Sequence, residues 1–391
     1  MQIDTKSLAI FWFFYMSGLA AIFPFFSLYF QQNVGLNGEQ LGIALAMHPL
    51  MGILISPLWG RWADLSGRRR DVLITVTVGS AIGYLLIPLA TNFFQLIVLL
   101  ALLSAFTAPA MAIATSFSFA VLSNDKNNNF GHVRVWGTIG YLLIILIFPL
   151  LISYLEPPSV SKKVSNGLLL IFPIASFFCL TASLFILRIP NRASVLVKSK
   201  KRDVLVLLRN FSYIRLLIIG FFAFGLLAGP IVLFPVFIVE KGGTIETISS
   251  LWIPMLMLEI PLIYFAGAGL KRIGARGLIA LGIACDGARW LITALADSLI
   301  WVFCVQLLHG AVVVGLIIGM QLYVEKEVPD RLRSSGQAIL TTVIGLGSVL
   351  SHLWTGIALE KYGASYPYYI SGSLALVLGY FAWVFLPSQK N

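Results

Sequence analysis

The sequence predicts an all-α integral membrane protein with twelve transmembrane helices. Of its 391 residues, 59% are hydrophobic and only 11% are charged, whereas soluble domains carry roughly 25% charged residues. The apolar residues also gather in long runs, and a bilayer span needs roughly 20 of them. Although the net charge is +11, no stretch could form the basic face of a soluble nucleic-acid-binding protein.

Twelve apolar runs justify the individual spans. The first, from Leu8 to Phe30, is too long for the core of a signal peptide and is interpreted as a retained span. Prolines such as Pro49, Pro109 and Pro254 lie within runs, which transporter helices tolerate. The runs centre near residues 19, 50, 80, 107, 144 and 177, and then near 225, 258, 286, 311, 344 and 377.

The spacing of the runs predicts two halves of six helices each. Residues 1–188 form the N-terminal half, and residues 212–391 form the C-terminal half. The polar interval 189–211 contains Lys198, Lys200, Lys201 and Arg202, so it is expected to be a cytoplasmic linker beside anionic lipid headgroups.

The distribution of Lys and Arg predicts the orientation. With the N-terminus inside, only Lys162, Lys163, Lys241 and Lys361 would lie outside, and Arg289 would lie within a span. The other basic residues of the 27 would all be cytoplasmic, as the positive-inside rule requires. Both termini are therefore expected on the cytoplasmic side of the cell membrane.

A short motif lies between the second and third runs. From Gly60 to Arg70 the chain reads G-R-W-A-D-L-S-G-R-R-R, which resembles the G-x-x-x-D-x-x-G-R-R loop of the major facilitator superfamily. Read alone, the three arginines could be only a positive-inside cluster. The resemblance implies two six-helix halves with inverted repeats and a conformational gating motif, whose residues here are Gly60, Asp64, Gly67, Arg68 and Arg69.

A weaker copy of this motif occurs between the eighth and ninth runs. Gly267 and Gly274 keep the spacing of the two motif glycines, and Arg276 repeats the second arginine. Lys271 stands where the first copy has aspartate. Glycine permits tight turns and close helix approach, and the aspartate could pair with an arginine or a helix N-terminus in one conformation only.

Five polar residues interrupt the apolar runs of the C-terminal half. An ionisable side chain at mid-span costs roughly 2.5–3.5 kcal/mol on insertion scales, so each needs a reason. Asp286 and Arg289 are three residues apart and share a helix face, as do Gln306 and His309. Together with Glu259 they are predicted to form a proton relay. Alternatively, Asp286 and Arg289 neutralise each other and hold helices together, and His309 is a packing residue.

A closer resemblance joins this chain to the phenylpropionate-type, nucleoside–proton and lactose-type permeases. It implies that Arg134 binds substrate and Tyr141 stacks on it, and that Glu259, Arg289 and His309 belong to the coupling and binding network. The matching segments are Pro24-Phe25-Phe26, Leu58-Trp59-Gly60, Phe130-Gly131-x-x-Arg134-x-Trp136-Gly137, Leu258-Glu259-Ile260, Arg289-Trp290 and Gln306-Leu-Leu-His309-Gly310.

Two departures from the lactose-type pattern matter. Val312 stands where that pattern has a carboxylate three residues after the histidine, which shifts the proton to Glu259 with Asp286 and His309 as assistants. Ser116 stands where that pattern has the acidic partner of the arginine, which argues against galactoside recognition. Arg134 would then be open to a substrate carboxylate.

The sequence therefore predicts a proton-coupled symporter importing a small organic solute: an aromatic or other organic acid, a nucleoside or a sugar. Gln306 joins Arg134 and Tyr141 as an expected substrate-binding residue. The rivals are a proton-driven efflux antiporter, a membrane-embedded enzyme and a channel; no His-Glu-x-x-His motif supports an enzyme and no filter-like loop supports a channel. The expected partners are protons, the solute and the bilayer, with no cofactor, metal or nucleic acid, and the expected state is a monomer.

Overall fold

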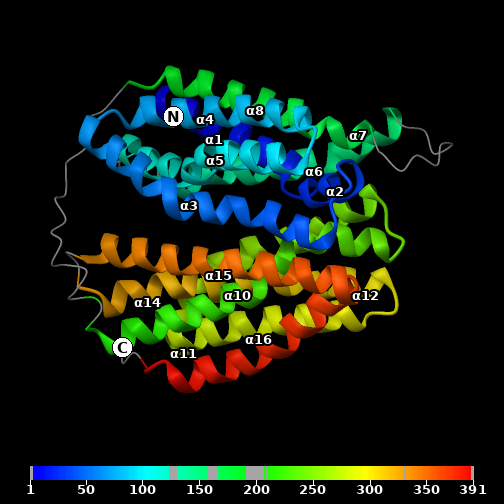
Figure 1. Cartoon of the computed structure of the whole chain (residues 1–391). Helices are drawn as coiled ribbons and strands as arrows, with labels where there is room; N and C mark the ends of the chain where they lie inside the picture. The colour runs from blue at the N-terminus through cyan, green and yellow to red at the C-terminus, as the bar shows by residue number, and fades with distance from the viewer. Residues whose placement is uncertain are drawn as a thin grey trace. The chain divides into compact units, whose positions relative to one another are not determined.

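The computed structural model describes residues 3–122, 130–155, 166–190, 207, 209–329 and 332–388. Every regular element within these residues is a helix (Figure 1). Inside the same ranges, twelve helical stretches are long and apolar enough to cross a membrane. Each stretch contains one of the centres predicted above, so the twelve-span all-α class is confirmed.

The first six spans use nine helical elements, because three spans are each divided into two elements. A break at residues 23–25 divides the first span, where Pro24 leaves the chain without a backbone donor. The elements are α1 (Ile3–Ile22), α2 (Phe26–Gln32), α3 (Gly38–Ser66), α4 (Arg69–Leu86), η1 (Ile87–Leu89), α5 (Phe93–Leu122), α6 (Phe130–Leu155), α7 (Asn166–Leu169) and α8 (Ile171–Leu187).

The last six spans are more irregular. Helix α11 contains two of them, which we call span 8 (Ile245–Ile263) and span 9 (Arg272–Leu295), and the non-helical Gly274 interrupts it. Span 10 (Leu299–Glu327) passes through five successive elements. The elements are α10 (Phe211–Glu240), α11 (Ile245–Leu295), α12 (Leu299–Val305), η2 (Gln306–Leu308), α13 (His309–Val312), η3 (Val313–Ile318), α14 (Gly319–Glu327), α15 (Arg333–Tyr362) and α16 (Ser365–Phe385).

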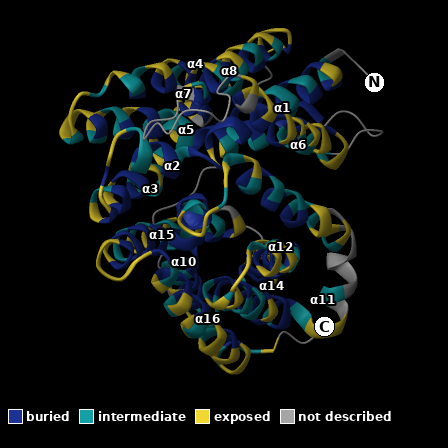
Figure 2. Cartoon of the chain, turned by 90° about the vertical axis from the view of Figure 1, so that its right-hand side faces the viewer, coloured by how far each residue is buried: buried dark blue, intermediate teal, exposed yellow. Residues whose placement is uncertain are grey.

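Exposed residues occur along many helices (Figure 2), and large apolar residues are among them. Leu58 is 62% exposed, Phe94 76%, Ile300 73% and Val377 66%. In water such a surface would drive aggregation. In a bilayer it contacts lipid tails that are as apolar as the side chains themselves, so the pattern fits a multi-pass membrane protein.

The helices form two compact units. Unit 1 comprises Met1–Leu36 and Met47–Val197, and unit 2 comprises Asn37–Ala46 and Lys198–Asn391. Most of the predicted linker at 189–211 lies outside the described residues. The first turns of α3 thus belong to unit 2, where the Gly38 N–H donates to Glu360 Oε2 on α15 at 2.6 Å. A Cβ at Gly42 would lie 3.1 Å from Cα of Gly356 on the same helix.

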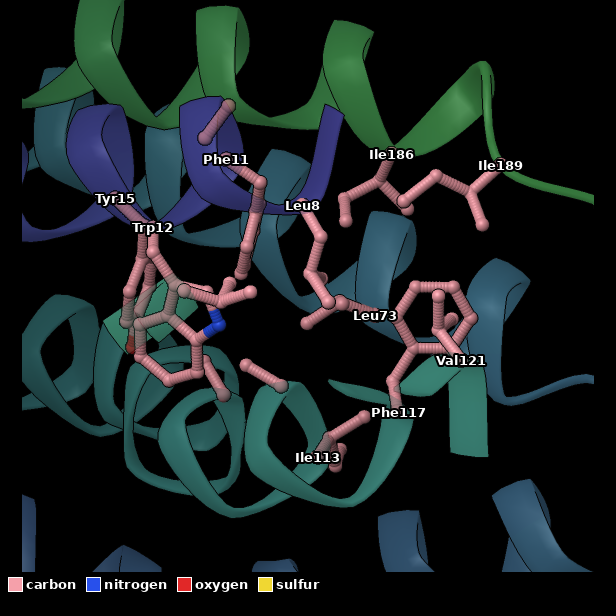
Figure 3. Packing of buried hydrophobic residues seen from close by; sticks show 14 of the residues in the cluster. Leu8, Phe11, Trp12, Tyr15, Leu73, Ile113, Phe117, Val121, Ile186 and Ile189 are labelled. Carbon is pink, nitrogen blue, oxygen red and sulfur yellow. The ribbon is translucent and has the colours of Figure 1, made fainter. Parts of the chain in front are cut away.

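In unit 1, α1 packs against α6 and α8, and α4 packs against α5 and α8. The interior is apolar and aromatic, and Trp12 of α1 is fully buried in it. Figure 3 shows side chains of this cluster converging from several helices. Its labelled members are Leu8, Phe11, Trp12, Tyr15, Leu73, Ile113, Phe117, Val121, Ile186 and Ile189.

In unit 2, α10 packs against α15 and α16, and α11 packs against α16. Trp290 of span 9 anchors this interior, with its ring 5.2 Å from that of Tyr368 and 5.8 Å from that of Phe234. The Tyr368 hydroxyl donates to the carbonyl of Pro230 at 2.9 Å. An aromatic core therefore holds span 9 in place, directly beside Arg289.

Candidate functional site

A buried ion pair lies at the centre of span 9. Arg289 Nη2 is 2.6 Å from Asp286 Oδ1, and the two side chains are 2% and 5% exposed, respectively. Their three-residue separation places them on one helix face. The guanidinium also stacks over the Trp290 ring at 3.9 Å, and such cation–π contact strengthens when both groups are desolvated.

Arg289 connects span 9 to span 10. Its Nη1 lies 2.7 Å from Nδ1 of His309. Because arginine has only donors, Nδ1 must accept this hydrogen bond. His309 is therefore neutral in this arrangement, with its proton on Nε2.

Glu259 of span 8 lies beside the same turn of span 10. A Cβ at Gly310 would lie only 2.8 Å from the Glu259 backbone nitrogen and 2.7 Å from the Leu258 carbonyl carbon. Glycine at 310 thus allows the backbone that carries His309 to approach span 8 closely. The Glu259 side chain is partly buried.

Gln306 lies one turn before His309 and is fully buried, and its Nε2 donates to the carbonyl of Val302 at 3.2 Å. Thr293, one turn after Arg289, is also fully buried. The sequence prediction omitted Thr293. Its spacing from Asp286 and Arg289, which continues their helix face, is the signal that could have found it.

Arg134 of α6 occupies a separate site in unit 1. Its guanidinium lies 4.9 Å above the Trp12 ring, and Trp12 Nε1 donates to Ser118 Oγ at 3.0 Å. A Cβ at Gly137 would lie 2.7 Å from Arg134 Nη1, so this glycine leaves room for the guanidinium. Tyr141 packs against the apolar cluster of the same unit.

The sequence prediction did not include Trp12 or Ser118, because an aromatic or serine in an apolar run carries no signal of its own. The structure brings Asp286, Arg289 and His309 into direct contact, with the Glu259 backbone beside them. Arg134 and Tyr141 lie on one helix of unit 1.

The second glycine of each copy of the loop motif has a positive φ. Gly67 has φ 64° and Gly274 has φ 69°, a left-handed conformation that favours glycine. Nothing lies within 4 Å of a Cβ built at Gly60, so the close helix approach expected at that glycine is not seen here. The side chain of Asp64 lies outside the described residues.

Arginines following the two turn glycines bind the ends of other helices. Arg70 Nη1 donates to the Ile189 carbonyl just after α8 at 3.2 Å, and Arg276 Nη1 donates to the Leu386 carbonyl just after α16 at 3.4 Å. Cations are favourable at helix C-termini. Arg68 immediately precedes α4 and Arg69 begins it. Within the described ranges, no three or more His, Cys, Asp or Glu residues are grouped to hold a metal ion.

Comparisons with known proteins agree with this fold. Residues 5–370 match the model of the MFS_1 like family. The maltose permease of Geobacillus stearothermophilus is 28% identical over 94% of this chain and 93% of that protein. The class E tetracycline resistance protein of Escherichia coli is 25% identical over 86% of this chain and 83% of that protein.

Among solved structures, the nucleoside transporter NupG superposes with a TM-score of 0.83 at 17% identity, with both chains fully covered. The xylose transporter XylE from E. coli gives 0.73 at 12% identity, covering 99% of this chain and 96% of that one. At these identities the likeness concerns the fold. With the family match over residues 5–370, it follows that the chain belongs to the MFS_1 like family of the major facilitator superfamily and is a multi-pass membrane transporter.

Proposed function

We propose that the chain is a proton-coupled symporter that imports a small polar organic solute by alternating access. Glu259 carries the proton, and Asp286 and His309 assist it. The observation that carries the proposal is the buried contact of Asp286 and His309 with a single arginine. Charges inside a membrane protein are expensive, and they mark ion pathways and proton relays.

The geometry supports proton coupling because Nδ1 of His309 cannot accept the hydrogen bond from Arg289 and carry a proton at the same time. Arg289 donates to Nδ1 of His309, and a proton on that nitrogen would remove its lone pair and repel the guanidinium. Proton arrival at His309 must therefore break the bond between spans 9 and 10. Glu259, on span 8 beside the same turn, can hold the proton while Asp286 keeps Arg289 neutralised. Coupling then requires that solute and proton together favour one of two states.

We propose Arg134 and Tyr141 of unit 1 and Gln306 of unit 2 as substrate-binding residues. Arg134 offers a planar set of donors above the Trp12 ring, and such a fork suits carboxylates and hydroxyls. The relatives' names include a maltose permease. We therefore propose a sugar or nucleoside as the solute, with an organic acid as the competing class.

The loop motif is proposed to act in gating. Gly60, Asp64, Gly67, Arg68 and Arg69 would bias the protein between its two states, with Gly67 fixing the turn that precedes α4. The protein is proposed to reside in the cell membrane as a monomer with both termini in the cytoplasm. A reporter enzyme that is active only outside the cytoplasm, fused to the C-terminus, tests the orientation. It should stay inactive if the C-terminus is cytoplasmic.

The test is proton movement in proteoliposomes that hold the full chain and a pH-sensitive dye. Maltose, uridine and 3-phenylpropionate are added one at a time. Glu259→Gln is compared with Glu246→Gln, a matched change at an exposed glutamate in the first turn of α11. We expect solute-dependent proton entry in the wild type and in Glu246→Gln, and its loss in Glu259→Gln.

Two results would overturn parts of the proposal. Normal pH-driven accumulation by Glu259→Gln would exclude Glu259 as the proton carrier. Proton exit upon solute entry would identify an antiporter instead.

A further inference from the structure

Spans 9 and 10 form an antiparallel pair whose alignment is fixed by contacts. A Cβ at Gly282 would lie 2.7 Å from the Gly315 carbonyl carbon, and Arg289 meets His309 further along. Moving one turn onward from Arg289 gives Thr293, and moving one turn back from His309 gives Gln306. Thr293 and Gln306 are therefore expected at a similar level along the pair.

Both residues are fully buried and carry polar atoms without a partner. Within the part of the chain that the structure describes, Thr293 Oγ1 and Gln306 Oε1 have no hydrogen-bond partner. The Gln306 amide cannot simply be reversed, because its Nε2 donates to the Val302 carbonyl and an oxygen there would be repelled. Unpaired buried polar atoms are rare in folded proteins and require an explanation.

Arg289 supplies a third such atom. Its two terminal nitrogens meet Asp286 and His309, while its Nε finds no acceptor among the described residues. The guanidinium charge is already balanced by Asp286. The unpartnered atoms of Thr293, Gln306 and Arg289 together thus make a neutral demand for hydrogen bonds: one acceptor, one donor and one hydroxyl that can do either.

The backbone around Gln306 is not a regular α-helix. A 3-10 turn begins at Gln306, and a π-helical segment follows at Val313–Ile318. Such interruptions often mark hinges and functional sites, because their hydrogen bonds are easily rearranged. Gln306 can therefore move relative to span 9 without breaking a continuous helix.

We propose that Thr293 and Gln306, together with Arg289 Nε, form a subsite that reads a hydroxyl group of the solute. A hydroxyl can donate to Gln306 Oε1 and accept, on its two lone pairs, from Arg289 Nε and from the Thr293 hydroxyl, so one group satisfies all three unpaired atoms. A carboxylate fits poorly for two reasons. Its oxygens and Gln306 Oε1 are all acceptors and would repel each other, and the charge of Arg289 is already balanced by Asp286. The subsite thus selects a neutral, hydroxyl-bearing solute such as a sugar or nucleoside, and this inference rests on the proposed transport function.

Equilibrium binding to the purified full chain tests the subsite without any proton gradient. Radiolabelled maltose, uridine and 3-phenylpropionate are the probes. Thr293→Val removes the hydroxyl at constant shape, Thr293→Ser retains it, and Thr293→Ala serves if the valine variant does not fold. Thr342→Val is the matched control, since that exposed hydroxyl only donates to the Ala338 carbonyl of its own helix.

We expect the wild type to bind maltose or uridine, and Thr293→Val to weaken that binding on the order of tenfold or more, because the bound solute hydroxyl then loses a hydrogen-bond partner in a buried site. Thr293→Ser and Thr342→Val should stay within about threefold of the wild type, a difference of less than about 1 kcal/mol. Thermal stability of Thr293→Val should not fall, since an unpaired buried group has been removed.

Two outcomes would overturn the subsite: the wild type binds only 3-phenylpropionate or none of the probes, or Thr293→Val binds maltose or uridine as the wild type does. Failure of the transport proposal looks different. In that case Thr293→Val would still weaken binding, but the proteoliposomes would show no solute-dependent proton movement.

Discussion

Replacing Asp286 by asparagine tests the buried ion pair through stability alone. The change keeps the size of the side chain but removes the negative charge 2.6 Å from Arg289 Nη2. Arginine does not deprotonate in proteins, so its charge would stay buried at 1% exposure without a counter-ion. Breaking a buried pair in this way costs about 3–5 kcal/mol, and we expect Asp286→Asn to lower the free energy of unfolding by that amount.

The assay is reversible unfolding in mixed detergent micelles, followed by tryptophan fluorescence. The single variants Asp286→Asn and Arg289→Gln are compared with the double variant. The double variant should recover most of the loss because it buries no charge, giving a coupling free energy of about 3 kcal/mol or more. The reasoning is refuted if Asp286→Asn lies within about 0.5 kcal/mol of the wild type, or if the losses simply add.

Three further predictions concern backbone and binding. Gly274→Ala should cost about 1–2 kcal/mol of folding free energy, because φ is 69° there and alanine is strained at positive φ. Gly60→Ala, where the space around the Cβ is open, is the control. Equal stability of the two variants would mean that alanine is not strained at position 274. Gly42→Leu should lower the thermal unfolding midpoint, because the added side chain would push the first turns of α3 away from the backbone of α15, at a cost of about 1–3 kcal/mol. An unchanged midpoint would mean that α3 and α15 do not pack closely at Gly42. Arg134→Lys keeps the charge but loses the planar fork, so solute affinity should fall about tenfold in equilibrium binding. Unchanged affinity would mean that Arg134 only anchors its helix at the membrane–water interface.

The fold could be predicted because the bilayer imposes a strong constraint. Every span must satisfy its own backbone and present apolar side chains to lipid, so twelve runs translate directly into twelve helices. The ion pair could also be anticipated, since Asp286 and Arg289 are three residues apart on a helix. Positive φ at Gly274 follows from the motif copy, in which this glycine corresponds to Gly67.

The remaining parts of the candidate site depend on packing that no local pattern encodes. The contact between Arg289 and His309 requires a particular alignment of two helices, and the sequence gives no sign of the short approach at Gly310. The Trp12–Ser118 bond likewise joins α1 to α5. Thr293 lay within reach of the periodicity argument, but a threonine in a span usually bonds its own backbone and attracts no notice.

The π-helical segment of span 10 accommodates one extra residue between His309 and Gly319. A π-helical segment holds more residues per turn than an α-helix. Because each π residue advances the chain by less than the roughly 100° of an α-helical residue, the six residues Val313–Ile318 turn the chain about as far as five α-helical residues would. Deleting one of them would therefore allow a continuous α-helix and leave His309 nearly in phase with Gly319, where a Cβ would lie 3.2 Å from Ile279 Cγ1. The extra residue is absorbed locally, so its deletion should spare the contact between Arg289 and His309, whereas loss of the histidine itself would remove it.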